Sequence, residues 1–224
     1  RPGGEGRLRM YVHNFEQAGL TDQILTYDRH GELYPIHRYE ELNRSIPSAL
    51  DDISGHLEYA GKPIDQIMIS SKLKEASVLE ANMLESALIR NHGAGSFSIE
   101  PLPVQAQFAP IFDFLVDDVN DDGHADIIAG GNKYDVSIHQ ASYNASIGTF
   151  LLGTAEAGFR PVNPVTAGIP LEGEVRNIKL VSIGGEKQIV VAVNDEEMRF
   201  FSYTLKAEKS ASNTNETTIT AMDQ

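Results

Sequence analysis

A polar loop with the sequence Asp-Val-Asn-Asp-Asp-Gly-His-Ala-Asp, residues 118–126, separates two short apolar segments, residues 112–116 and 127–131. Short apolar runs on either side of a polar turn predict two neighbouring strands joined as a hairpin. Gly123 lets the chain turn sharply because it has no Cβ. This feature constrains the fold most, since it predicts a β-hairpin in the middle of the chain and a mainly β fold class.

Oxygen-bearing side chains recur at alternate positions of this loop. Asp118, Asn120, Asp122 and Asp126 stand at positions 1, 3, 5 and 9, and the carbonyl of His124 stands at position 7. Calcium binds roughly six to eight oxygen ligands, and its hard character makes the His124 imidazole a poor ligand. The spacing therefore predicts a Ca²⁺ site whose ligands are these five residues, with His124 contributing its carbonyl.

Other interpretations of the loop differ in how well they fit. An EF-hand needs a Glu at position 12 of its loop, where this chain has Ala129. Magnesium suits the loop less well because it demands near-octahedral geometry. An acidic turn whose Asp side chains only accept hydrogen bonds from backbone amides stays open as the alternative to an ion site.

Residues 14–22 repeat the outline of this loop with fewer ligands. Asn14, Glu16, Gly19 and Asp22 match positions 1, 3, 6 and 9, whereas Ala18 at position 5 has no side-chain oxygen. We interpret this segment as a degenerate copy, and whether it holds an ion is left open.

The rest of the chain alternates between strand patterns and one helical stretch. Apolar spacing of three to four residues, broken by Pro and Gly, predicts short helices inserted at about residues 39–80. Alternating or apolar runs bounded by turn residues predict strands at 8–14, 23–27, 32–34, 83–90, 97–99, 112–116, 127–131, 148–153, 159–162, 175–183, 188–194 and 198–205. The polar residues 209–224 lack any pattern and predict a flexible tail.

These strands fall into about three similar units within residues 1–208. Each unit has a strand, a loop, a strand, a variable stretch, and two more strands joined by a turn. The first unit runs from Leu8 to Pro101 around the helical insertion, the second from Ile111 to Val162, and the third starts at Val175. Four short antiparallel strands per repeat predict the blades of a partial β-propeller.

Composition limits the classes of partner. The net charge of −14 disfavours nucleic acid and anionic membranes. No apolar run of about 18 residues predicts a membrane span. The chain has no Cys, which excludes disulfides and thiolate sites. Residues 1–6 lack an initiator Met and an apolar signal, so we interpret them as the cut edge of a longer protein.

Several of these segments together resemble the FG-GAP/VCBS repeat family. This family comprises calcium-loop propellers also found in integrin α-subunits and in ASPIC/UnbV-type bacterial surface proteins. The similar segments are the loop 118–126 followed by Ile127 and Ile128, the hairpin 91–97, the segment 101–110, and Gly130-Gly131-Asn132.

The resemblance covers roughly residues 8–205 and carries several implications. It implies a seven- or eight-bladed propeller in the full protein, the five calcium ligands named above, and no shared catalytic residue. It also implies an extracytoplasmic location, either secreted, periplasmic or at the cell surface.

The function expected from this sequence is calcium-dependent binding of, or adhesion to, a protein or glycan rather than catalysis. Two alternatives remain: part of a glycan-active propeller enzyme, or a structural fragment with no partner of its own. The histidines are scattered and show neither a nucleophile motif nor zinc-type spacing. Those weighed for catalysis are His13, His37, His56, His92 and His139.

Overall fold

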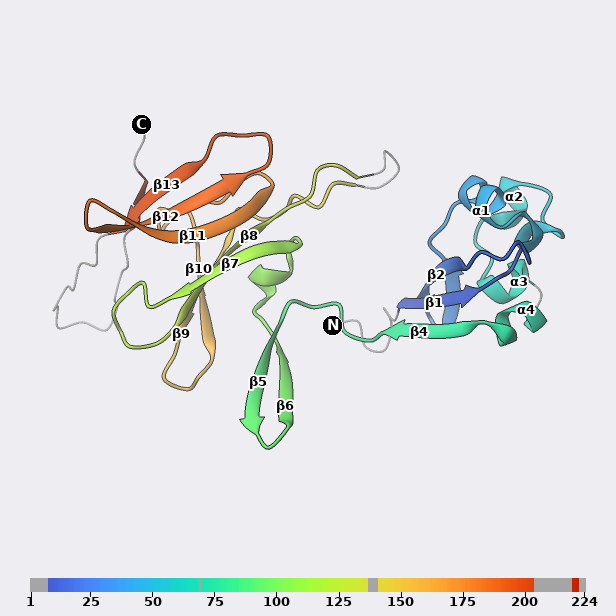
Figure 1. The fold of residues 1–224 in the computed structure, drawn as a ribbon, viewed down its shortest axis with the longest axis horizontal. Coiled ribbons are helices and arrows are strands. Elements are labelled where there is room, and N and C mark those ends of the chain that lie inside the picture. Colours follow the sequence, from blue (N-terminus) through green and yellow to red (C-terminus); the bar gives the residue numbers. More distant parts are fainter. Residues whose placement is uncertain (1–7, 69, 137–140, 204–218, 222–224) are drawn as a thin grey trace. The chain divides into compact units, whose positions relative to one another are not determined.

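A computed structural model describes residues 8–68, 70–136, 141–203 and 219–221. The fold is mainly β and contains several antiparallel sheets (Figure 1), as the sequence predicts. The chain divides into two compact units, Arg1–Leu84 and Glu85–Gln224.

The first unit contains a four-stranded sheet with the strand order β3-β2-β1-β4. Its strands are β1 (Leu8–His13), β2 (Asp22–Arg29), β3 (Glu32–Pro35) and β4 (Ser77–Ala81). Every side chain of β4 is exposed, so this strand has no alternating pattern by which the sequence could reveal it. β4 pairs with β1 although the whole helical stretch lies between them in the sequence. Leu8 is opposite Ala81 and Val12 is opposite Ser77.

Five short helices connect β3 to β4 and confirm the expected helical insertion, except that its predicted end, residues 77–80, belongs to the strand β4. They are α1 (Tyr39–Ser45), η1 (Pro47–Leu50), α2 (His56–Tyr59), α3 (Ile64–Ile67) and α4 (Ser70–Glu75). None is long enough to be stable in isolation, so packing must hold them. Buried side chains from these helices and from β2 form the core of this unit, with Ile24, Leu42 and Ile46 fully enclosed.

The hairpin of β5 (Ala87–Gly93) and β6 (Ser96–Pro101) forms a sheet of its own. The predicted turn is confirmed, but the strand expected from Met83 begins only at Ala87. The expected four-stranded unit from Leu8 to Pro101 is wrong. The places beside β2 and β1 that this hairpin would have filled are taken by β3 and β4.

The second unit contains two four-stranded sheets whose neighbouring strands follow chain order. The first consists of β7 (Ile111–Asp117), β8 (Asp126–Gly131), β9 (Thr149–Gly153) and β10 (Phe159–Val162). The second consists of β11 (Val175–Ile183), β12 (Glu186–Val193), β13 (Arg199–Tyr203) and β14 (Ile219–Ala221). A short helix, η2 (Val104–Gln107), precedes β7.

The strand β14 corrects part of the predicted tail. Residues 219–221 pair with β13, from Phe201 opposite Ala221 to Tyr203 opposite Ile219. The other residues of the predicted tail, 209–218 and 222–224, lie outside the described residues, as do residues 1–7.

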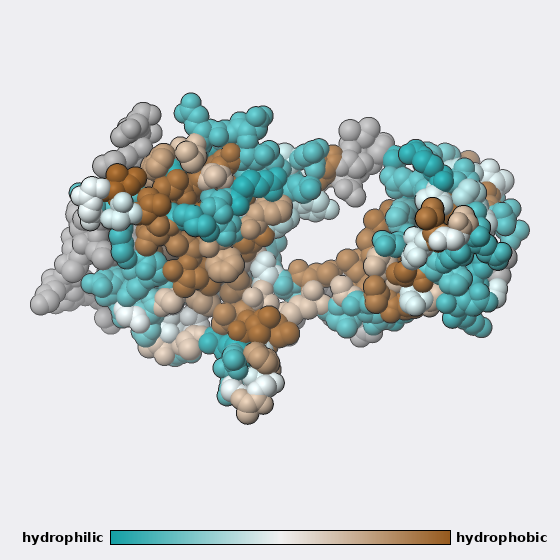
Figure 2. Space-filling view, viewed as in Figure 1, coloured by the Kyte–Doolittle hydropathy of each residue, from teal (hydrophilic) through white to brown (hydrophobic). Residues whose placement is uncertain are grey.

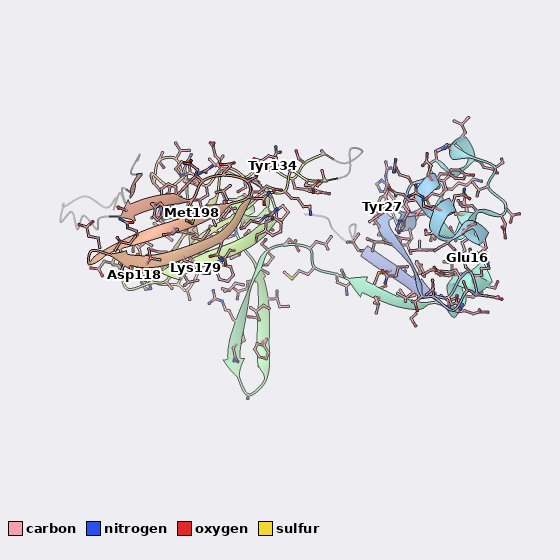
Figure 3. The ribbon with its side chains drawn as sticks, turned by 45° about the horizontal axis from the view of Figure 1, so that its top comes forward. Glu16, Tyr27, Asp118, Tyr134, Lys179 and Met198 are labelled. Atoms are coloured by element: carbon pink, nitrogen blue, oxygen red, sulfur yellow. The ribbon has the colours of Figure 1, made fainter. Side chains whose placement is uncertain are left out.

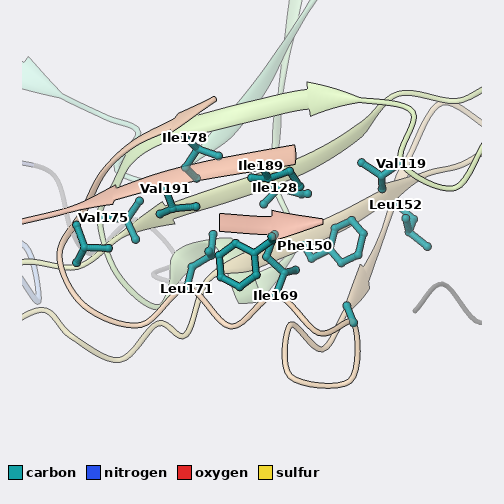
Figure 4. Packing of buried hydrophobic residues seen from close by; sticks show 13 residues of the cluster. Val119, Ile128, Phe150, Leu152, Ile169, Leu171, Val175, Ile178, Ile189 and Val191 are labelled. Atoms are coloured by element: carbon teal, nitrogen blue, oxygen red, sulfur yellow. The ribbon is translucent and has the colours of Figure 1, made fainter. Parts of the chain in front are cut away.

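The two sheets of the second unit share one apolar core, shown in Figure 4. Ile128 and Phe150 from the first sheet pack with Ile178, Ile189 and other residues of the second. β11 lies beside β7 and β8. Within the second unit, the described strands form two four-stranded sheets that pack on this core, and they do not include a closed ring of blades.

Polar links join β7 to the second sheet. The Asp113 carboxylate accepts a hydrogen bond from the Ile178 N–H at 2.8 Å. Lys187 Nζ lies 2.9 Å from the Asp117 carboxylate. The opposite side of β7 exposes Phe112, Phe114 and Val116, and apolar residues form a continuous area on the face of this unit seen in Figure 2.

Candidate metal-binding loop

The loop 118–126 connects β7 to β8 at one end of the first sheet of the second unit. Asp117 and Asp126 face each other as the last strand pair before the loop, and Figure 3 shows Asp118 at this end of the sheet. Asp121 and Gly123 have left-handed backbone conformations, with φ of 58° and 86°. Asp tolerates this conformation better than most residues and Gly adopts it without strain, so the sequence suits the tight path of the loop.

The side chains at positions 1, 3 and 5 all accept hydrogen bonds from backbone amides at the tip. Asp118 accepts hydrogen bonds from the N–H of Asp122 at 3.1 Å and of Gly123 at 2.8 Å. Asn120 Oδ1 accepts from the same Asp122 N–H at 3.2 Å. Asp122 accepts from the His124 N–H and from Asn120 Nδ2, both at 2.8 Å. The structure therefore brings these three predicted ligands together.

Asp126, the predicted ligand at position 9, lies at the base of the loop and is 1% exposed. One carboxylate oxygen accepts the Val119 N–H at 3.0 Å, and the other accepts the Gly153 N–H of β9 at 2.8 Å. Burial raises the pKa of Asp126, and the charges of Asp122 and Asp118 raise it further, against the opposite effect of the two amides. Its evident role is to fasten the loop to the neighbouring strand.

Gly153 allows this close approach between the loop and β9. A Cβ at this position would lie 2.5 Å from the Ala125 carbonyl oxygen, which is too close for any side chain. From the sequence, Gly153 is only the end of a predicted strand, because contact with a loop 27 residues earlier leaves no local signal.

The tip of the loop concentrates negative charge. Asp121 and Asp122 are exposed, and Asp118 is half-buried. Among the described residues, no Lys or Arg forms an ion pair with any of the three. Like charges at this spacing repel one another, and a bound cation would remove that repulsion.

The donor set fits a hard cation in part. Two carboxylates and one amide oxygen are available at the tip, each with lone pairs beyond those used by backbone amides. The described part of the chain contains no group of three or more His, Cys, Asp or Glu side chains arranged to hold a metal. A cation here would therefore depend on Asn120 and on backbone carbonyls such as that of His124, in addition to Asp118 and Asp122.

The loop 14–22 has the same backbone design. Phe15 at position 2 is buried like Val119, and its N–H donates to Asp22 at 3.0 Å, as that of Val119 does to Asp126. Positions 4 and 6 again have positive φ, with 55° at Gln17 and 79° at Gly19.

The polar side chains of this earlier loop are used differently. Glu16 accepts the Ser48 N–H of η1 at 2.8 Å, so it fastens the loop to the helices. Ala18 offers no oxygen. Asn14 Oδ1 is buried and has no hydrogen-bond partner among the described residues.

The buried apolar residue at position 2 is a signal that the sequence analysis missed. Val119 and Phe15 are the large apolar side chains that follow position 1 of each loop, and both are at most 2% exposed. Alignment of the two loops on their Asp and Gly residues would have revealed this shared position, which binds the loop to the core.

The histidines weighed for catalysis do not gather at one site. His37 Nε2 accepts the Leu25 N–H at 3.2 Å, and His92 bonds to Ser98 at 2.8 Å. His13 and His56 lie near Glu75 and Glu40 at 3.7 and 3.3 Å. His139 lies outside the described residues.

No helix in the described part of the chain has the length and apolar character needed to cross a membrane. Comparison of the chain with protein-family models, with curated proteins and with solved structures finds no match in any of the three.

Proposed function

We propose that the chain is a calcium-binding module of FG-GAP/VCBS-type repeats, in which the loop 118–126 holds Ca²⁺. The observation that carries this proposal is the gathering of three side chains at the tip: Asp118 and Asn120 both accept the Asp122 N–H, and the Asp122 carboxylate accepts from Asn120 Nδ2 and the His124 N–H. It supports a site in which these side chains and the His124 carbonyl bind the ion. Asp126 orients the loop from below, with both oxygens already bonded to amides.

The limited number of carboxylates at the tip suggests weak binding. Calcium affinity rises with the number of charged ligands, and extracellular modules bind with Kd values of about 10⁻⁴ to 10⁻³ M. We place this loop in that range, which suits a protein that works outside the cytoplasm. The role of the ion would be to neutralise the acidic tip and to rigidify the end of the sheet.

The arrangement of the second unit supports repeats of propeller type. Each of its two sheets has four strands in chain order, and the first strand of one sheet, β11, lies beside the first strand of the other, β7. Successive blades around a central axis have this relation. The module would then use its surface to bind a protein or a glycan and would not act as an enzyme.

Isothermal titration calorimetry with Ca²⁺ tests the site. We expect one ion to bind wild-type protein with a Kd of about 10⁻⁴ to 10⁻³ M and Mg²⁺ to bind more weakly. Asp122→Asn should weaken calcium binding at least about tenfold. Asp121→Asn is the matched control, because it removes the same charge from the same loop at a position that is not a predicted ligand.

Equal binding by both variants would show that only the overall charge of the loop attracts the ion. Absence of heat with wild-type protein at millimolar calcium would overturn the proposed site and leave the loop as a hydrogen-bonded acidic turn.

A further inference from the structure

A pocket in the first unit has positively charged lining residues, whereas the chain as a whole is negatively charged. It has a volume of about 310 Å³ and is lined by Tyr27, Tyr34, Tyr59, Arg29 and Lys62, together with Pro35 and Gly61. Both of its charged lining residues are cations, although the chain carries a net charge of −14. Tyr27 lies toward the end of β2 away from the loop that contains Glu16 (Figure 3), so the pocket is separate from that loop.

The aromatic wall comes from paired positions of two strands. Tyr27 on β2 is opposite Tyr34 on β3, and their rings lie 5.9 Å apart with a tilt of 33°. Tyr59 is held in place because its hydroxyl donates to the His37 carbonyl at 2.5 Å. Burial raises the pKa of Tyr59 to about 12, so it stays a neutral donor at physiological pH.

Arg29 is one of the two cations of this pocket, and it lies directly opposite Glu32 of β3 in the strand register. No described Asp or Glu forms an ion pair with it. The pKa of the Tyr34 hydroxyl is raised chiefly by its hydrogen bond to Glu32, and the charge of Arg29 opposes that rise. The guanidinium therefore lies within electrostatic reach of the aromatic wall.

Two carboxylates that contact residues lining the pocket are already hydrogen-bonded. Glu32 accepts the Tyr34 hydroxyl at 2.6 Å. Glu58 lies 3.4 Å from Lys62 Nζ and also accepts the N–H and the hydroxyl of Ser54 at 3.0 and 2.6 Å. Glu58 thus positions Lys62 without lining the pocket, while Arg29 keeps its capacity for a bidentate contact with an anion.

We propose that this pocket binds a carboxylate carried on a six-membered ring. The carboxylate would face Arg29 and Lys62, and the ring would lie against Tyr27 and Tyr34. A flat apolar wall suits the face of a ring, and two cations suit a single anionic group. The volume is at the lower end of ligand pockets, which span about 300–1,000 Å³, so it suits one ring.

Two sources share this chemistry, a uronic-acid sugar and an aromatic carboxylate. Titration of ¹⁵N-labelled full chain with sodium D-glucuronate, sodium benzoate, methyl glucoside and sodium sulfate distinguishes them by the shifts of the backbone amides of Tyr27, Arg29, Tyr34 and Gly61. Saturable shifts with glucuronate alone identify a sugar site, and shifts with benzoate alone identify an aromatic-acid site. Saturable shifts with both support the shared chemistry.

Other outcomes would overturn the proposal. These are no saturable shift with either carboxylate, equal binding of the uncharged glucoside, or equal binding of sulfate, which would indicate simple anion attraction. The experiment is done in chelator, so that its result does not depend on the proposed calcium loop.

A matched pair of variants tests the assigned residue. Arg29→Gln should weaken carboxylate binding at least about tenfold, because the charge-assisted contact is lost. Arg44→Gln, on α1 and equally exposed, should bind like wild type. Arg29→Lys should recover part of the affinity, because the charge returns without the planar fork. Equal weakening by Arg29→Gln and Arg44→Gln would show that Arg29 is not a specific contact.

Discussion

The loops 14–22 and 118–126 have similar backbone conformations but different sets of side-chain oxygens. In both, an apolar residue at position 2 is buried, positions 4 and 6 have positive φ, and an Asp at position 9 accepts the N–H of position 2. Only the later loop has side-chain oxygens at positions 1, 3 and 5 that meet at its tip. The shape of the loop and its capacity for an ion are therefore set by different residues.

The comparison explains how the earlier loop keeps its shape without a full ligand set. Its Glu16 bonds to Ser48 of η1 instead of turning toward the tip. Contacts with neighbouring elements thus replace whatever stabilisation an ion would give. The later loop has its own contact of this kind, from Asp126 to Gly153 of β9, so its tip residues remain available for a ligand.

The largest effect should come from Asp126→Ala. It leaves the N–H groups of Val119 and Gly153 without acceptors, and each buried donor without an acceptor costs about 1–3 kcal/mol. We expect a loss of about 2–5 kcal/mol in the free energy of unfolding of the second unit, measured by urea denaturation. Asp22→Ala should cost about 1–2 kcal/mol in the first unit, because Asp22 is only half-buried. Equal losses of stability in the two variants would contradict the different roles of Asp126 and Asp22.

Calcium should stabilise the protein by a smaller amount, and only through the later loop. At a calcium concentration ten times Kd, the free energy of unfolding should rise by about 1.4 kcal/mol, which is lost in chelator. For a unit of this size, the shift in Tm is about 3–6 °C. Asp122→Ala should abolish this response, as followed by circular dichroism during heating. A variant that still responds would contradict the assignment of Asp122.

Gly19→Ala and Gly123→Ala should have similar effects on stability. Both glycines have positive φ and open space around the missing Cβ, so the cost is the backbone strain of about 1 kcal/mol. Denaturation in chelator measures this cost for each unit. A much larger cost for Gly123→Ala would mean that the two backbones differ in rigidity.

The smallest effect should be a gain of function in the earlier loop. Ala18→Asp restores an oxygen at position 5 of a loop whose Asn14 Oδ1 has no hydrogen-bond partner within the described part of the chain. Because Glu16 remains bonded to Ser48, we expect a second calcium site weaker than the first, with less than about 1 kcal/mol of added stability at the same calcium concentration. Calorimetry should show the stoichiometry rise from one toward two. A second site as tight as the first would show that position 3 matters little.

Local sequence determined most strands of the second unit. The runs predicted at 159–162 and 175–183 coincide with β10 and β11, and the hairpin around the loop 118–126 is confirmed. Such strands are visible because apolar alternation and glycine turns act between near neighbours. The oxygen spacing of the loop is also a local feature of the sequence, and the proposed calcium site depends on it.

Tertiary structure decided which strands pair and which carboxylate fastens the loop. The exposed β4 pairs with β1 more than 60 residues earlier and takes the place beside β1, while β5 and β6 form a separate sheet. Asp126 looked like one more ligand in the sequence, but burial beneath the loop directs both of its oxygens to amides, one of them from β9. Pairing and burial depend on segments distant in the chain, whereas turn formation and ligand spacing depend on a few adjacent residues.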